Sequence, residues 1–125
     1  MIKQIKSSEI KKFLNDNKDT ELLDVRTQEE WDNIGRPDGE KLDLKTHFIT
    51  IVRSPDPSAN KDFIEEVKKK VDAKKQLLVM CKAGGRSMMA AQLLSQENIV
   101  CINVSDGFEG NGENAGWKNE GLPTK

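Results

Sequence analysis

The sequence has few of the residues that build metal sites or disulfide frameworks. It contains two cysteines, Cys81 and Cys101, and one histidine, His47, in 125 residues. The cysteines form no Cys-x-x-Cys pair, which leaves too few soft ligands for a zinc site, so we expect no metal. In a reducing compartment we also expect no disulfide between them.

Long apolar runs are absent as well. No run approaches the length that spans a bilayer, and residues 1–10 lack the apolar core of a signal peptide. This pattern predicts a cytoplasmic protein without membrane association.

An excess of charge of one sign is also lacking. The 20 Lys and Arg residues nearly balance the 21 Asp and Glu residues, for a formal net charge of -1. Such a chain has no overall positive potential that would attract nucleic acid, so we expect no nucleic-acid partner. Any anion-binding site has to depend on local charges. A length of 125 residues suits a single core, which predicts one domain over residues 1–125.

Short apolar segments alternate with amphipathic ones along the chain. The apolar segments predict five strands, near residues 2–5, 22–25, 48–52, 77–80 and 100–104. The intervening helices are expected after Ser7, after the capping box of Thr27 and Glu30, after Asn60, and from about Ser87. A surface loop is expected over 54–58 and a longer one over 105–116.

This alternation predicts the fold class. We expect an α/β protein with a central parallel five-stranded sheet and helices on both faces. Because such sheets bind ligands at the carboxyl ends of their strands, residues that directly follow the strands are the first functional candidates.

The segment 77–87 carries the strongest functional signal. Leu77–Met80 reads as a buried strand, and Gly84 and Gly85 permit a sharply curved loop whose amides point into one cup, with Cys81 on its rim. A helix starting just after the loop would stabilise an anion beside the sulfur. With Lys82 and Arg86 nearby, we expect Cys81 to have a high thiolate fraction and to be a nucleophile.

The remaining chemistry-bearing residues have plainer interpretations. Asp24 and Arg26 end another strand at the same edge, and we expect them to pair with main chain or neighbours around the site rather than with substrate. Cys101 lies between Val100 and Ile102 and reads as a buried structural thiol. His47 is expected to be a satisfied or exposed polar residue, so a Cys-His mechanism has no evident base.

The cysteine loop resembles the active-site loop of single-domain rhodanese-like sulfurtransferases. The resembling residues are Cys81, Lys82, Ala83, Gly84, Gly85, Arg86 and Ser87. Leu23-Asp24-Val25-Arg26 followed by Glu30-Trp31 is similar to the first signature of that family, and Gly107-Phe108 with the segment 116–123 is similar to its C-terminal end. Two departures are visible: Gly35-Arg36-Pro37 stands where the family usually has Gly-His-Ile, and Asn111–Asn114 looks like an insertion.

The resemblance implies a sulfane-sulfur transferase without a metal or organic cofactor. Cys81 would attack a donor such as thiosulfate, become a persulfide, and pass the outer sulfur to cyanide or a thiol, including a thioredoxin-like or other protein thiol. The loop residues Lys82 to Ser87 would bind the substrate, with Arg86 and Lys82 on the sulfonate of thiosulfate.

Two alternatives come from the same residues. Cysteine-dependent phosphatases and arsenate reductases also end an anion-binding loop in arginine, but they place five residues between Cys and Arg, whereas four lie between Cys81 and Arg86. The tighter loop favours a single sulfur atom over a tetrahedral oxyanion. A non-catalytic binding module on this fold is the second alternative, and such a module would be expected to lose the cysteine.

Overall fold

The computed structural model describes residues 2–52 and 60–125, and its centre is a parallel sheet of five strands. The strands are β1 (Lys3–Ile5), β2 (Thr20–Asp24), β3 (Lys45–Phe48), β4 (Gln76–Met80) and β5 (Cys101–Val104). Their order in the sheet is β1-β5-β4-β2-β3, and every neighbouring pair is parallel. The α/β fold class predicted from the sequence is confirmed.

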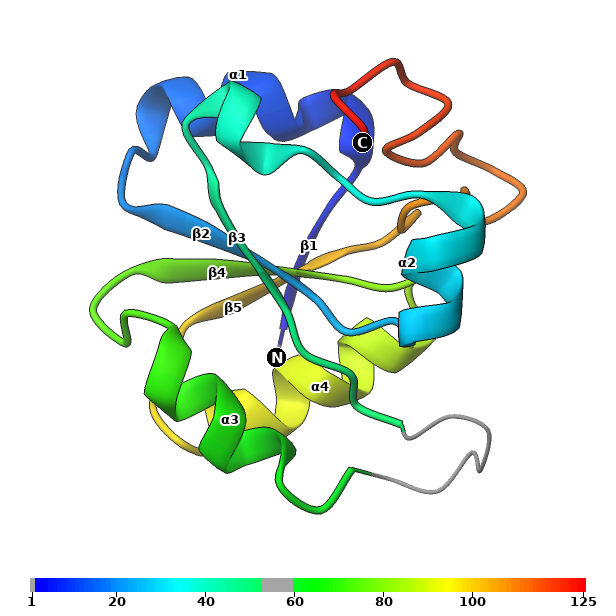
Figure 1. Cartoon of the computed structure of the whole chain (residues 1–125). Helices are drawn as coiled ribbons and strands as arrows, with labels where there is room; N and C mark the ends of the chain where they lie inside the picture. The colour runs from blue at the N-terminus through cyan, green and yellow to red at the C-terminus, as the bar shows by residue number, and fades with distance from the viewer. Residues whose placement is uncertain (1, 53–59) are drawn as a thin grey trace.

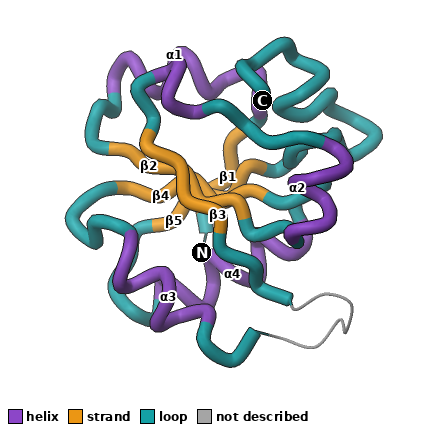
Figure 2. Tube along the Cα trace, viewed as in Figure 1, coloured by secondary structure: helices purple, strands orange, loops and turns teal. Residues whose placement is uncertain are grey.

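Helices cover both faces of this sheet (Figure 1). They are α1 (Ile10–Asp16), α2 (Gln28–Ile34), α3 (Phe63–Lys70) and α4 (Gly85–Ser95), with short 3-10 helices at Ser7–Glu9 and Gly39–Leu42. Figure 2 shows the strands gathered in the middle, with α1 on one side of the sheet and α3 and α4 on the other. None of the helices in the described ranges has both the length and the apolar character that crossing a bilayer requires.

Two hydrophobic clusters, one on each face, join the helices to the sheet. Alternate residues of β2 divide between them: Leu23 packs with α3 and α4, whereas Leu22 packs with α1 and the C-terminal residues Phe108 and Trp117. Leu77–Met80 of the central strand β4 are all apolar because both faces of this strand are covered. Cys81 and Cys101 belong to the cluster under α3 and α4.

The third strand differs from its prediction. The apolar residues of 48–52 favoured a strand there, but β3 is Lys45–Phe48. β3 is an edge strand with one partner, so polar residues are tolerated in it. Beyond it, Ile49 and Ile51 donate their amides to the carbonyls of Asp24 and Val25 and bury their side chains in the core, so their apolar character reflects burial in a connecting segment.

Helix starts follow the predicted signals with small shifts. The Thr27–Glu30 capping box of α2 is present, with the Thr27 side chain accepting from the Glu30 amide. α4 begins at Gly85, two residues before the expected Ser87. Asn60 stands two residues before the N-cap Asp62 of α3 and accepts the Asp62 amide, and the predicted loop over 54–58 lies outside the described residues.

Candidate active site

Cys81 follows β4 directly, at the carboxyl edge of the sheet between β2 and β5. Its side chain is almost fully buried, with 1% of the residue exposed. The Gly84 amide donates to Sγ over 3.1 Å, and Ser87 Oγ lies 3.3 Å from the same sulfur. The loop therefore curls back over its own cysteine, which is buried rather than on the rim that the sequence predicted.

Only one of the two loop glycines is sterically required. Gly84 has φ +106°, and a Cβ there would meet the Ser105 carbonyl oxygen at 2.4 Å. A Cβ at Gly85 would meet nothing within 4 Å, because Gly85 is the first residue of α4. On the facing loop, Gly107 has φ +60° and a Cβ there would lie 2.3 Å from the Lys82 carbonyl oxygen. The loops after β4 and β5 therefore touch backbone to backbone, which holds the shape of the cysteine loop.

The N-terminus of α4 faces this loop. The first intrahelical bond of α4 runs from the Met88 amide to the Gly84 carbonyl. The amides of Gly85, Arg86 and Ser87 precede it, so they have no carbonyl partner within the helix. Together with the helix dipole they favour negative charge beside the sulfur.

Arg86 is held by a residue of α2. Its two terminal nitrogens donate to the two carboxylate oxygens of Glu30 over 2.6 and 2.9 Å. Burial raises the pKa of Glu30, but the hydrogen bonds from Arg86 and Thr27 and the Arg86 charge outweigh it and bring the pKa to about 2. The same hydrogen bond to Glu30 raises the pKa of Arg86 above its usual value. The Arg86 charge is therefore largely neutralised at the site.

Glu30 was not foreseen as a site residue. The sequence identified it as the far end of a capping box and as part of the segment that resembles the first family signature, and it fills the capping role by accepting the Thr27 amide over 3.1 Å. No local signal links it to Arg86, since 56 positions separate the two residues. The helix cap orients the carboxylate, and the carboxylate orients the arginine.

Asp24 and Arg26 form a fully buried ion pair beneath the site. Arg26 donates through Nε and Nη2 to the Asp24 carboxylate and through Nη2 to the Gly35 carbonyl, and its guanidinium stacks 4.2 Å from the centre of the Phe108 ring. Both side chains have 0% exposure, so neither presents an atom to solvent in this structure. Phe108 in turn donates its amide to the Cys81 carbonyl over 2.8 Å.

A second unforeseen residue, Asn103, lies behind Ser87. Ser87 Oγ is 2.5 Å from Asn103 Oδ1, while Asn103 Nδ2 donates to the Gly84 carbonyl over 3.2 Å and to Gln4 Oε1 over 3.1 Å. The sequence did contain a signal for it. A lone polar residue inside the apolar run of β5 has to find hydrogen-bond partners when buried.

Cys101 and His47 lie away from Cys81. Cys101 pairs with Leu77, four residues before Cys81 on the neighbouring strand, which puts the two cysteines about 13 Å apart along the sheet. Both cysteines are free, and the predicted absence of a disulfide between them is confirmed. His47 is on β3, two strands from β4, and bonds Glu21 over 2.8 Å, so it is the satisfied polar residue that the sequence favoured.

The remaining loop residues lie at or near the surface. Lys82, Ala83 and Gly85 are exposed, and Arg86 is partly buried. The segment Asn111–Asn114 folds on itself, with Asn111 Oδ1 accepting the amides of Glu113 and Asn114, and Asn111 Nδ2 donating to the Ser105 carbonyl. It is therefore tied to the loop that faces Gly84.

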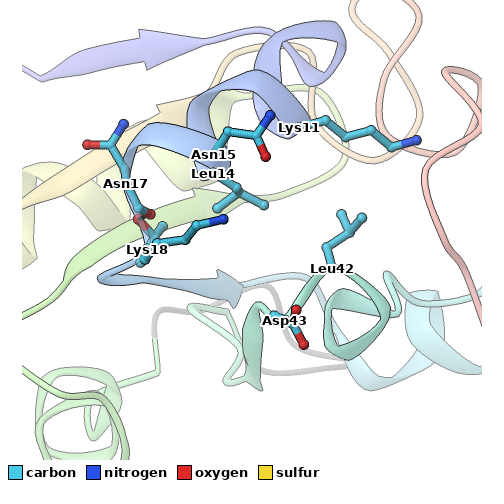
Figure 3. Close-up of a pocket in the computed structure, with 8 residues that line it drawn as sticks. Lys11, Leu14, Asn15, Asn17, Lys18, Leu42 and Asp43 are labelled. Atoms are coloured by element: carbon cyan, nitrogen blue, oxygen red, sulfur yellow. Dashed lines mark hydrogen bonds between the residues drawn. The ribbon is translucent and has the colours of Figure 1, made fainter.

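A separate hollow of about 520 Å³ opens at the opposite edge of the sheet (Figure 3). Thr20, the first residue of β2, lines it, so it lies at the amino end of the strands. Figure 3 shows Leu14 and Leu42 facing each other across the space, with Lys11 and Lys18 around it. This hollow shares no residue with the cysteine loop.

A five-stranded parallel sheet with a cysteine directly after its central strand characterises the class of protein. The family model described as "Rhodanese-like domain" matches residues 7–113. The chain belongs to the rhodanese-like domain family.

Known proteins resemble this chain over nearly its whole length. An uncharacterized protein of Rickettsia prowazekii, RP600, is 34% identical over 124 residues, covering 98% of this chain and 97% of that protein. The crystal structure of Rv0390 from M. tuberculosis has a TM-score of 0.86 and 29% identity, over 98% of this chain and 96% of that chain. The polysulfide-sulfur transferase homodimer from Wolinella succinogenes shares the fold, with a TM-score of 0.70 and 22% identity, over 99% of this chain and 78% of that chain.

Proposed function

We propose that this protein transfers sulfane sulfur through a persulfide on Cys81. The observation that carries the proposal is the environment of Sγ, which receives a hydrogen bond from the Gly84 amide and lies at the N-terminus of α4. Both features favour a thiolate and, later, a persulfide anion.

The reaction balances with no further reagent. The Cys81 thiolate attacks the outer sulfur of the donor, and the sulfur–sulfur bond of the donor breaks with its electron pair leaving on the remainder, sulfite in the case of thiosulfate. An acceptor thiolate or cyanide then attacks the outer sulfur of the persulfide and releases the Cys81 thiolate. Lys82, Ala83, Gly84, Gly85, Arg86 and Ser87 surround the transferred sulfur in this proposal.

The distance between the two cysteines supports an external acceptor. Cys101 cannot reach the persulfide across about 13 Å of sheet, so the outer sulfur has to leave to another molecule. A small thiol, cyanide or a protein thiol of thioredoxin type fits this step. The Wolinella succinogenes neighbour is a polysulfide-sulfur transferase, which agrees with the proposal, and at 22% identity its likeness to this chain extends to the fold alone.

The bidentate pair of Arg86 and Glu30 weighs against a phosphatase. A phosphatase arginine donates to two phosphoryl oxygens at once, whereas both terminal nitrogens of Arg86 already donate to Glu30 at 2.6 and 2.9 Å. Three N–H groups of Arg86 remain outside this pair, which is enough to orient the sulfonate of thiosulfate.

The test is thiocyanate formation from thiosulfate and cyanide, measured beside hydrolysis of an aryl phosphate. We expect thiocyanate without phosphate release, and a mass gain of one sulfur atom on the Cys81 peptide after exposure to the donor alone. Phosphate release without thiocyanate would replace the proposal by the phosphatase. A protein inactive with thiosulfate, polysulfide and organic persulfide donors would be a binding module.

A further inference from the structure

Asn103 is hydrogen-bonded to Ser87, and Ser87 in turn contacts the Cys81 sulfur. It is 1% exposed on β5, and Ser87, the third residue of α4, is fully buried between it and the sulfur. The chain of contacts runs from Cys81 Sγ to Ser87 Oγ at 3.3 Å and on to Asn103 Oδ1 at 2.5 Å. The reaction proposed above assigns no role to Asn103.

The Asn103 amide has only one orientation that satisfies its neighbours. Its nitrogen faces the Gly84 carbonyl at 3.2 Å, and a backbone carbonyl can only accept. The nitrogen also donates to Gln4 Oε1 on β1, the residue paired with Asn103 across the sheet. The amide oxygen therefore has to face Ser87.

This orientation decides which way the Ser87 hydroxyl points. A hydroxyl has a single proton, and the amide oxygen at 2.5 Å is an acceptor only. Ser87 donates to Asn103, and its lone pairs face the sulfur. The 3.3 Å contact between Ser87 Oγ and Cys81 Sγ can then be a hydrogen bond only if the Cys81 S–H donates to Ser87.

We propose that Asn103 is a positioning residue that opposes ionisation of Cys81 by drawing the Ser87 hydroxyl proton away from the sulfur. When the thiol loses its proton to solvent, the Ser87 hydroxyl turns, breaks its bond to Asn103 and donates to the thiolate. The turned hydroxyl is then placed to stabilise the persulfide anion. Asn103 and the Cys81 thiolate thus compete for the Ser87 hydroxyl proton. The inference rests on the proposed function for the reactive role of the sulfur.

The charged groups around Cys81 do not account for this competition. Arg86, in the first turn of α4, interacts electrostatically with Glu30 of α2, with Asp24 at the end of β2 and with Cys81 itself. Lys82 is exposed beside the cysteine. The Asp106 carboxylate after β5 is engaged by the Ser7 and Gly116 amides. An Asn103 substitution by a neutral residue leaves each of these charges unchanged.

The test is an ultraviolet titration of the Cys81 thiolate, taken as the difference from Cys81→Ser. Removing the acceptor in Asn103→Ala frees the Ser87 hydroxyl for the thiolate, so the midpoint should move to lower pH, with about a threefold to tenfold larger thiolate fraction below it. Asn103→Asp should move the midpoint in the opposite direction. In a Ser87→Ala background, Asn103→Ala should produce no shift.

The carboxylate of Asn103→Asp would raise the midpoint by charge repulsion in any case. The shift in Asn103→Ala and its loss in the Ser87→Ala background are therefore the results that a purely structural role would not produce. An unchanged midpoint in Asn103→Ala, or the same shift with and without Ser87, would overturn the inference. If the Asn103 variants do not fold, the infrared S–H stretch of the unsubstituted protein decides. A hydrogen-bonded Cys81 S–H that loses its red shift in Ser87→Ala supports the inference, and a free S–H overturns it.

The two proposals fail separately. The titration and the infrared band report the protonation of Cys81 whether or not sulfur is transferred. Absence of thiocyanate with the expected titration would reject the proposed function alone, and thiocyanate with an unmoved titration would reject the role of Asn103 alone.

Discussion

Cys81 and Cys101 are both buried in one core, on neighbouring strands of the same sheet, yet their surroundings are opposite. Cys101 sits within β5 among apolar neighbours, and burial raises the pKa of its thiol to about 12. Cys81 stands one residue past the end of β4, where the Gly84 amide reaches its sulfur and α4 begins. Burial alone therefore does not make a cysteine reactive or inert, because the donors at the strand end decide whether the anion is stabilised.

Replacing each cysteine by serine should give the largest difference in activity between the two positions. Cys81→Ser should lower thiocyanate formation at least about 1000-fold, because the nucleophile is lost. Cys101→Ser should leave the rate within about twofold of the starting protein. Thiol titration should find one reactive cysteine in the native protein and two in denaturant, and a native protein in which Cys101 reacts first would reverse the assignment.

The two loop glycines provide a test of the shape of the cysteine loop. Gly84→Ala should lower the free energy of unfolding by at least about 2 kcal/mol, because φ is +106° and the new Cβ would meet the Ser105 carbonyl oxygen at 2.4 Å. Gly85→Ala is the matched control, with open space around the Cβ. Urea denaturation should show Gly85→Ala unchanged or stabilised by up to about 1 kcal/mol. Equal losses in the two variants would contradict the loop geometry.

The pair of Glu30 and Arg86 should make the site region sensitive to acid. The pKa of Glu30 is about 2 in the folded protein against 4.5 ordinarily, so its contribution to stability is present above about pH 4.5 and disappears as the pH falls toward 2. After allowance for solvent screening, the contribution is about 1–2 kcal/mol. Urea midpoints measured between these pH values should fall more steeply in the unsubstituted protein than in Glu30→Gln. Parallel pH profiles would contradict the pairing.

The smallest expected effect concerns the electrostatic potential around Cys81 at neutral pH. Glu30→Gln keeps the capping box but leaves the Arg86 charge without its counter-ion. Alkylation of Cys81 by anionic iodoacetate should then gain about twofold to fivefold over alkylation by neutral iodoacetamide. Glu29→Gln removes the same charge one residue earlier, on an exposed side chain, and should leave that ratio nearly unchanged.

Most of the strands and helices could be predicted because their signals are local. The apolar runs of β2, β4 and β5 and the capping box of α2 are readable within a few residues of sequence. β3 was misplaced because an edge strand tolerates polar residues, while the apolar residues that follow it are buried without a strand of their own. Hydrophobic periodicity in the sequence indicates which residues are buried. Buried apolar residues marked the position of a strand only where both faces of that strand are covered.

The sequence by itself determined the α/β fold, the rhodanese-like loop and the cysteine that opens it, since all three depend on neighbouring residues. Only the tertiary structure decided that Glu30 holds Arg86 and that Asn103 binds Ser87. These contacts depend on the strand order β1-β5-β4-β2-β3, which brings distant segments to one edge of the sheet. A hydrogen bond requires its two atoms to lie within about 3 Å of each other. The number of residues between two positions in the sequence does not indicate that distance until the sheet has formed.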